Sequence, residues 1–309
     1  MKKYIIKRLL SIIPLLIGIS FLAFTLMNLS QSDPAEVALR INEVTPTDEA
    51  IAEMRNELGL DKSFIERYAT WMINIVQGDF GNSFINNKPV IDEMKQAMPA
   101  TLLLSLVSLF IIICISLLAS VLCTLYEGSI VDRTIRGAIY VSESMPSFWI
   151  GLLLMWFFSV KLNLFPTSGM DSPSSIVLPA VTLSLAYLST YVRLLRNNMV
   201  QNKGENYVLY AKARGLKGST ITKHILKNSL QSSVTALGMS IPKLIAGTVI
   251  VENIFAWPGV GRLCVTAIFN HDYPIIQAYV LLMAVLFVVF NFLVDIVTTL
   301  VDPRMRREG

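Results

Sequence analysis

Long runs of apolar residues recur along the chain, separated by shorter polar stretches. Two runs, residues 9–29 and 102–126, contain no charged residue, and the shorter run 176–192 is also uncharged. A helix needs about 20 apolar residues to cross the hydrocarbon core of a bilayer while satisfying its own backbone hydrogen bonds. The pattern therefore predicts membrane-spanning helices.

Three further runs, residues 138–160, 234–255 and 274–294, complete a set of six predicted spans. The charges inside or beside them are Glu143, Lys243, Glu252 and Asp295. A charge at bilayer depth is costly unless it is paired or faces a cavity, so all four are functional candidates. Lys243 and Glu252 lie nine residues apart and do not stack, so we expect each to face a pore or a partner subunit. The alternating pattern of barrel strands is absent. The predicted fold class is all-α, a polytopic membrane protein with six transmembrane helices.

The polar stretches suggest three parts. Residues 1–29 form the cytoplasmic N-terminus and the first span, 30–99 form an extracytoplasmic helical lobe, and 100–309 form the core transmembrane domain. This core contains a basic cytoplasmic loop at 197–230.

The composition agrees with a membrane protein and excludes several soluble classes. Of 309 residues, 53% are hydrophobic and only 16% are charged, whereas a soluble domain carries about 25% charged residues. The three cysteines are scattered, so they indicate no disulfide framework. With only two histidines, a dense metal cluster is not expected.

The basic residues predict the orientation. If the N-terminus is cytoplasmic, six spans return the C-terminus to the same side, and 17 of the 26 basic residues then lie inside. The segment 30–99 holds twelve acidic residues against six basic ones, as an outer segment should. The first run is longer than a signal-peptide core of about 7–15 residues and lacks a cleavage site, so we interpret it as a retained anchor.

The outer segment predicts two short helices. Thr45 or Thr47 can cap the first, which has acidic residues in its opening turn and can end at Gly59. Residues 63–76 place aromatic and aliphatic side chains at helical spacing, and the glycines of 78–81 end this second helix. For most of the acidic residues in this segment, the simplest interpretation is that they are solvated surface charges.

The cytoplasmic loop predicts a pair of helices lying across the membrane face. Residues 206–216 form a short helix ended by Gly215, and a second helix can begin at Ser219 or Thr220 and continue into the fifth span. Such a pair could present an apolar knob to a partner protein. A basic loop that contacts phospholipid is the alternative.

Specific residues of this loop are similar to those by which permeases of ABC importers dock their ATPases. The similar residues run from Ala211 to Leu216 and include His224 and Asn228. The resemblance extends along nearly the whole chain and indicates the dipeptide, oligopeptide and nickel permease family. It is carried by Asp33-Pro34-Ala35, Gly78-Asp79-Phe80-Gly81, Pro99-Ala100-Thr101-Leu102, Leu178-Pro179-Ala180, Val251 to Arg262, Asp272-Tyr273-Pro274 and Asp302-Pro303-Arg304.

The resemblance implies a type I ABC importer permease in the bacterial inner membrane. Its partners would be a second, homologous permease that completes a heterodimeric pore, two ABC ATPase subunits, an extracytoplasmic binding protein and the lipid bilayer, with no nucleic acid. ATP and Mg²⁺ would bind the ATPase subunits and this chain would bind no cofactor, since it has no Walker-type phosphate loop. The expected ATPase-coupling residues are Tyr207, Ala211, Ala213, Arg214, Gly215 and Leu216.

Two departures from the family pattern stand out. Leu209 and Tyr210 occupy positions where the general ABC motif has an acidic residue and alanine. Residues 30–32 replace the usual proline-glycine before Asp33, which leaves the local turn open.

The substrate is predicted from resemblance, which favours nickel or a nickel/cobalt-metallophore chelate; a di- or oligopeptide is the alternative. The candidate translocation residues are Lys243, Glu252, Trp257, His271 and Asp272. Imidazole suits nickel, although His271 can equally be a hydrogen-bonding residue at the membrane interface. The metal ligands, if any, are left unassigned. A membrane enzyme is disfavoured because the sparse histidines and acids suggest no catalytic cluster, and a receptor or structural protein would not explain the basic helix pair.

Overall fold

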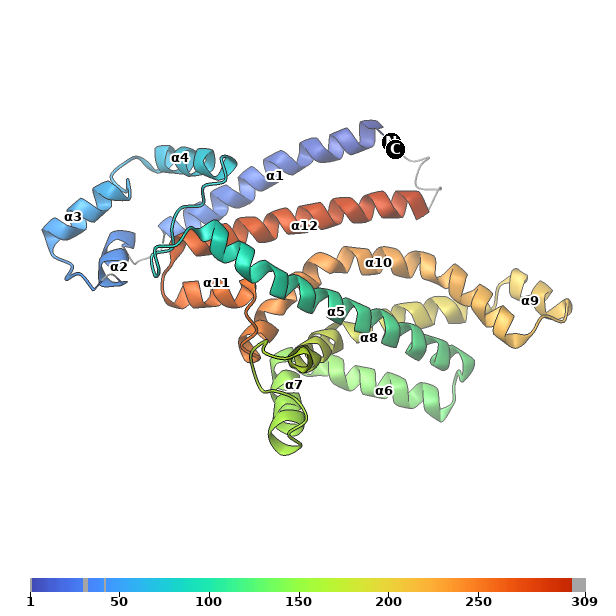
Figure 1. Cartoon of the computed structure of the whole chain (residues 1–309). Helices are drawn as coiled ribbons and strands as arrows, with labels where there is room; N and C mark the ends of the chain where they lie inside the picture. Colours follow the sequence, from blue (N-terminus) through green and yellow to red (C-terminus); the bar gives the residue numbers. More distant parts are fainter. Residues whose placement is uncertain (1, 30–32, 42, 302–309) are drawn as a thin grey trace. The chain divides into compact units, whose positions relative to one another are not determined.

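The computed structural model describes residues 2–29, 33–41 and 43–301 (Figure 1). These residues are almost entirely helical, and the only strand-like pairing among them is an isolated bridge between Asn82 and Pro89. The predicted all-α fold is confirmed. The triplet 30–32, the family ending Asp302-Pro303-Arg304 and the basic residues Arg306 and Arg307 lie outside the described residues.

The chain divides into two compact units, Met1–Thr101 with Pro258–Val289, and Leu102–Trp257 with Phe290–Gly309. The first unit contains α1 (Lys2–Asn28), α2 (Pro34–Ile41), α3 (Asp48–Glu57), α4 (Phe64–Val76) and α11 (Val260–Phe269), with the start of α5 (Val90–Leu125) and most of α12 (Tyr273–Val301). The second unit contains the rest of α5, then α6 (Ile130–Ser144), α7 (Ser147–Leu154), α8 (Val177–Lys203), α9 (Asn206–Ala213) and α10 (Gly218–Ile254).

The two helices predicted in the outer segment form where their capping residues require. The Thr47 hydroxyl accepts a hydrogen bond from the Ala50 N–H, and Ser63 forms a capping box with Glu66. Gly59 and Gly78 follow α3 and α4 with φ of +64° and +86°, a conformation that glycine adopts at little cost. The preceding α2 was not predicted.

Helix α4 packs on the C-terminal half of α1 through aromatic side chains. The Phe24 ring centroid lies 5.6 Å from that of Tyr68 and 5.5 Å from that of Trp71. Ser20 and Tyr68 share a hydrogen bond of 2.9 Å between their hydroxyls. Aromatic contacts of this kind add about 0.5–1.5 kcal/mol each beyond their burial, so they hold the lobe helix against the first span.

In the second unit, α5 is joined to α8 by small polar residues. The Ser184 hydroxyl donates to the Ser108 carbonyl at 3.1 Å, and the Ser120 hydroxyl donates to the Val192 carbonyl at 3.1 Å. Small residues allow helices in a membrane to approach closely. The contacts fix α8 against the middle of the uncharged part of α5.

Among the described residues, five helices are long and apolar enough to cross a membrane, and a bent pair of helices makes up to six; the five are α1, α5, α8 with the short 3-10 turn before it, α10 and α12. The third predicted span, residues 138–160, is not a single straight helix. It corresponds to α6 and to α7 with the π-helical turn Met155–Lys161, and the helix bends by 108° between these two segments. The break has a local cause, because Pro146 disfavours helical geometry at Met145, which is extended at φ −101° and ψ 137°.

Candidate functional site

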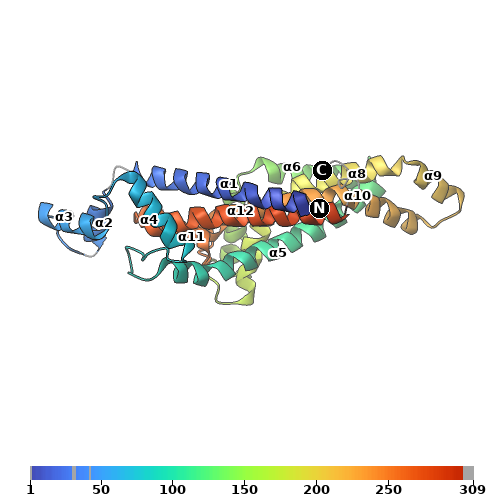
Figure 2. The same cartoon turned by 90° about the horizontal axis from the view of Figure 1, so that it is seen from above.

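The predicted coupling loop is present as α9 and the first turns of α10. Figures 1 and 2 both show α9 beyond the neighbouring ends of α8 and α10. Helix α10 begins at Gly218, next to the predicted start. The loop is anchored by one apolar cluster, whose buried members are Leu195, Met199, Val208, Ala211, Ile221 and Ile225. The cluster joins α8, α9 and α10, so the loop is a packed element of the permease.

The outward side of α9 carries large apolar side chains. Val208 and Ala211 are buried at 1% and 9% exposure, whereas Leu209 and Tyr210 are 68% and 71% exposed. Leu216, just after the helix, is 43% exposed. We name Leu209, Tyr210 and Leu216 the α9 knob. Exposed apolar side chains clustered on a short helix are a typical protein-binding feature.

Helix α9 ends in a complete Schellman motif. The Leu216 N–H donates to the Ala211 carbonyl at 3.1 Å, and the Gly215 N–H donates to the Lys212 carbonyl at 2.9 Å. Gly215 has φ +71°, the left-handed conformation that this motif requires. The glycine therefore sets the direction in which the chain leaves α9 and positions Leu216 in the knob.

The other predicted coupling residues surround this turn. The Tyr207 hydroxyl donates to the Asn202 side-chain oxygen at 3.3 Å. Ala213 and Arg214 are exposed, and Arg214 is the C-cap of α9. The structure thus brings Tyr207, Ala211, Ala213, Arg214, Gly215 and Leu216 together on one loop.

A buried ion-pair cluster supports the base of this loop and was not predicted. Asp132 of α6 is fully buried and accepts two hydrogen bonds of 3.0 Å from Arg196 of α8. Arg136 lies 3.2 Å from the same carboxylate, and the Gly128 N–H donates to it at 3.2 Å. The cluster holds the turn between α5 and α6 against α8. Sequence reasoning assigned Arg136 and Arg196 to the cytoplasmic positive charge and did not consider a partner for them.

Three candidate translocation residues lie on or after α10, in different environments. Lys243 is exposed, and its backbone carbonyl accepts a 2.7 Å hydrogen bond from the Tyr187 hydroxyl. Glu252 and Trp257 are 0% and 1% exposed, and the Trp257 N–H donates to the Glu252 carbonyl at 2.8 Å. Only Lys243 is open to a passing solute within this unit as described.

The other two candidates, His271 and Asp272, belong to the first unit. His271 is exposed with φ +55°. Asp272 is fully buried, where its carboxylate accepts hydrogen bonds from the Ser83 hydroxyl and, at 3.2 Å, from the Phe84 N–H. This clasp fixes the loop after α4 to the start of α12. Within the described part of the chain, no three His, Cys, Asp or Glu side chains are placed to hold a metal ion.

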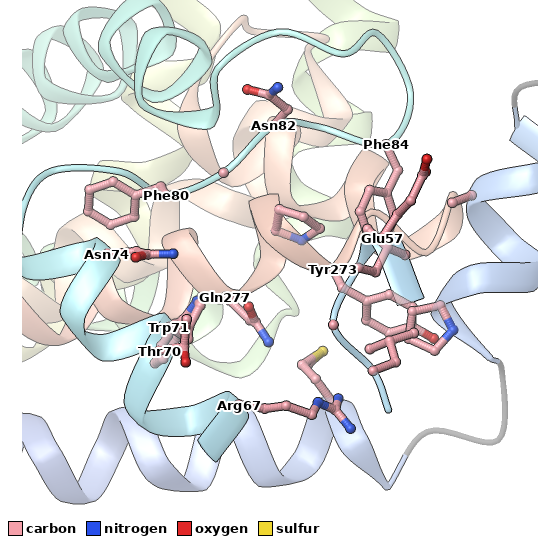
Figure 3. Close-up of a pocket in the computed structure, with 18 of the residues that line it drawn as sticks. Glu57, Arg67, Thr70, Trp71, Asn74, Phe80, Asn82, Phe84, Tyr273 and Gln277 are labelled. Carbon is pink, nitrogen blue, oxygen red and sulfur yellow. The ribbon is translucent and has the colours of Figure 1, made fainter. Parts of the chain in front are cut away.

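The first unit contains a cavity of about 770 Å³, lined by the lobe together with α1 and α12 (Figure 3). Figure 3 shows Thr70, Trp71 and Asn74 of α4 on one side of it and Tyr273 and Gln277 of α12 on another. Arg67 lines the cavity, donates to the Asn28 side-chain oxygen and lies 5.9 Å from the centroid of the Phe24 ring. Burial, with the charge of Arg55, lowers the pKa of Arg67 from its usual value.

Comparison with known proteins gives matches over nearly the whole chain. Residues 112–307 match the family described as the binding-protein-dependent transport system inner membrane component, and residues 1–106 match the N-terminal part of such membrane components. The metal-staphylopine import system permease protein CntB of Staphylococcus aureus is 41% identical over 308 residues, 99% of each chain. The oligopeptide transport system permease protein AppB of Bacillus subtilis is 36% identical over 317 residues, also 99% of each chain.

Among solved structures, the inward-facing MetNI methionine ABC transporter aligns with a TM-score of 0.57 at 18% identity, covering 68% of this chain and 96% of that chain. This likeness supports the type I permease fold. The chain belongs to the family of binding-protein-dependent inner-membrane transport components, and it is a permease of an ABC importer. It is a multi-pass membrane subunit without catalytic activity of its own; ATP hydrolysis resides in separate ATPase subunits, and a binding protein is a further partner.

Proposed function

We propose that this permease imports a metal chelate, with nickel or cobalt bound to a metallophore as the favoured cargo. The observation that carries the proposal is the 41% identity to a metal-staphylopine permease over 99% of both chains. A chelated metal brings its own ligands, so the permease need only contact the outside of the chelate. His271 and Asp272 then have no obligatory role as metal ligands.

A di- or oligopeptide is the second candidate cargo. The permease AppB, named for oligopeptide transport, is 36% identical over the same share of the chain. A peptide and a metal chelate are both polar solutes that a binding protein can enclose, and they would cross the same pore. The five-point difference in identity favours the chelate.

The same proposal assigns topology and partners. Both termini lie in the cytoplasm, in accordance with the bias of basic residues toward the inner segments. A second, homologous permease completes the pore as a heterodimer. The α9 knob inserts into a cleft of an ATPase subunit, so that closure of the ATPases on ATP turns the spans between inward-open and outward-open states. The exposure of Leu209 and Tyr210 supports this contact.

Two measurements test the cargo. The cognate binding protein is titrated with free Ni²⁺, with a nickel-metallophore chelate and with peptides by calorimetry, and cells lacking the permease gene are assayed for uptake of each. We expect binding and permease-dependent uptake of the chelate. Peptide binding with peptide uptake would replace the chelate by the second candidate.

The path residues are tested separately. Glu252→Gln and Lys243→Met are compared for uptake and for coupled ATP hydrolysis in the assembled transporter. Normal uptake and coupling in both variants would remove these two residues from the proposed translocation path.

A further inference from the structure

The exposed side of α8 is polar along its length. Exposed positions recur every three or four residues and therefore lie on one face of the helix. Before the exposed C-terminal Lys203, they are Ala186, Thr190, Arg193, Asn197 and Gln201. We name this set the α8 stripe. It contains no large apolar side chain.

Contacts with α5 place the first part of this stripe at bilayer depth. Ser108 and Ser120, the α5 residues that bond α8, both lie inside the uncharged run 102–126. Their partners on α8 are Ser184 and Val192, so the α8 segment between these two residues runs alongside the hydrocarbon-spanning part of α5. Ala186 and Thr190 lie within that segment.

Helix α5 offers a comparison, because its exposed surface at the same depth is suited to contact lipid. Between residues 103 and 118 its exposed residues are apolar, and all but one are large: Leu103, Leu106, Phe110, Cys114, Ile115 and Leu118. Lipid tails solvate such side chains and offer no hydrogen bonds to hydroxyl, amide or guanidinium groups. The α8 stripe is therefore unsuited to lipid.

The charges around the stripe do not cancel. Arg193 lies 3.4 Å from the carboxylate of Glu143 on α6, which also accepts a hydrogen bond from Ser189. This pair is electrically balanced. Lys243 on the adjacent α10 is exposed, and its backbone carbonyl accepts a hydrogen bond from Tyr187, the residue that follows Ala186; its side chain forms no ion pair with any side chain that the structure describes. One positive charge is left over at this depth.

We infer that the α8 stripe faces the water-filled translocation pathway and that Lys243 makes the pathway selective for anionic cargo. The cargo class is a solute with surplus carboxylates, whether a chelate or a peptide. The inference extends the proposed import function. It depends on that proposal only for the identity of the cargo. Water in the pathway hydrates the polar stripe, and the ammonium of Lys243 attracts the anion at a distance where the interaction is weak enough to permit release.

Charged thiol reagents test the stripe without any cargo. Ala186→Cys and Thr190→Cys, the two stripe positions at bilayer depth, are each introduced with Cys114→Ala and incorporated into the complete transporter. Each is reacted with a membrane-impermeant anionic and a cationic methanethiosulfonate, and modification of this chain is followed by mass spectrometry. Rates are divided by those of free cysteine in solution. Leu118→Cys, on the lipid-facing side of α5, is the control.

We expect both stripe cysteines to react and Leu118→Cys to remain unmodified. At Thr190→Cys the anionic reagent should have the higher normalised rate, by on the order of a few-fold, because one nearby positive charge in water attracts the anionic reagent and repels the cationic one. Adding Lys243→Met should bring the ratio close to one, whereas Lys161→Met, which removes another exposed lysine of the same unit, should not.

Two results would overturn the inference. Protection of both stripe cysteines in the assembled, functional transporter would show that a partner subunit covers the α8 stripe. Equal normalised rates at Thr190→Cys, or a ratio unaffected by Lys243→Met, would remove the charge selectivity. Either result leaves the cargo assignment untouched, because that assignment is read from the binding protein and from uptake.

Discussion

Arg196 on α8 holds Asp132 on α6 by two hydrogen bonds of 3.0 Å, and the Asp132 side chain is 1% exposed. The arginine is itself only 16% exposed. A buried carboxylate that is bonded at both oxygens fixes the relative positions of the two helices. Removing either side chain would leave the other one buried without its partner.

Replacing Asp132 should therefore strongly destabilise the permease. In Asp132→Ala, Arg196 loses its partner in a poorly hydrated site, and removing one member of a buried pair costs about 3–5 kcal/mol. Thermal unfolding in detergent and the amount of protein in the membrane measure the effect. The control is Glu127→Gln, which breaks the exposed 2.9 Å pair with Lys203 and should cost less than about 1 kcal/mol. Similar losses in the two variants would contradict a structural role for the buried pair.

Gly215→Ala should weaken coupling without removing the protein from the membrane. A Cβ at φ +71° is unfavourable by about 1–2 kcal/mol, which disfavours the turn that carries Leu216. We expect reduced cargo-stimulated ATP hydrolysis and reduced uptake. The matched control is Gly218→Ala at the first position of α10, where φ is not positive and no atom lies within 4 Å of the added Cβ. Unchanged coupling in Gly215→Ala would show that this turn is not needed for ATPase docking.

The α9 knob should determine whether ATPase subunits copurify. Tyr210→Ser together with Leu209→Ser removes two exposed apolar side chains, and burial of each such side chain contributes about 1.5–3 kcal/mol. Retention of the ATPases should fall by tenfold or more, while the permease itself stays folded. Ile73→Ser is the control, because Ile73 is 58% exposed on α4 in the lobe. Full retention in the double variant would place the ATPase contact elsewhere.

Asp272 and His271 should behave differently although they are adjacent. Asp272→Ala leaves the Ser83 hydroxyl and the Phe84 N–H without their acceptor, and an unsatisfied buried donor costs about 1–3 kcal/mol. Hydrogen exchange across residues 78–89 should become faster. His271→Asn should leave exchange unaltered, since the side chain is exposed and asparagine tolerates φ +55°. Faster exchange in both variants would show that the clasp involves more than the Asp272 carboxylate.

Cys264 should resist alkylation at neutral pH. Burial raises the pKa of its thiol to about 12, so the reactive thiolate is scarce at pH 8. Because an unfolded chain would release this proton near pH 9.0, the thiol also makes stability fall as pH rises from about 9 toward 12. Iodoacetamide labelling should spare Cys264 and modify Thr266→Cys, an exposed position on the same helix. Rapid labelling of native Cys264 at pH 8 would contradict its burial.

Much of the fold could be predicted because single-helix features follow from local sequence. The apolar lengths indicated the spans, the cap at Thr47 indicated α3, and the helical spacing of apolar side chains over residues 63–76 indicated α4; the capping box at Ser63 was not predicted. The bend at Met145 was missed because the apolar run continues past Pro146. In the sequence, Pro146 is the only sign that the helix breaks there. Length and composition do not report the direction in which a helix resumes.

The helix pair after α8 was also predictable, since Gly215 marks the end of α9; its role in coupling stays a prediction from the resemblance. The ion-pair cluster around Asp132 was not, because its partner Arg196 lies 64 residues away and a sequence does not show which charges meet. Likewise, the candidates Lys243 and Glu252 look equivalent in the sequence, yet the first is exposed and the second is buried. Helix rotation, which decides between these environments, depends on the packing of neighbouring helices.

The serines of α5 have a consequence for engineering. In a water-soluble protein, replacing a buried serine by leucine can add apolar burial and raise stability. Here Ser108 is fully buried, and its carbonyl accepts the 3.1 Å hydrogen bond from Ser184 of α8. Lipid is as apolar as leucine, so burying a larger side chain gains little, while its volume would force α5 and α8 apart. For this helix pair, a serine-to-leucine substitution is therefore expected to lower stability, the opposite of its effect in a soluble core.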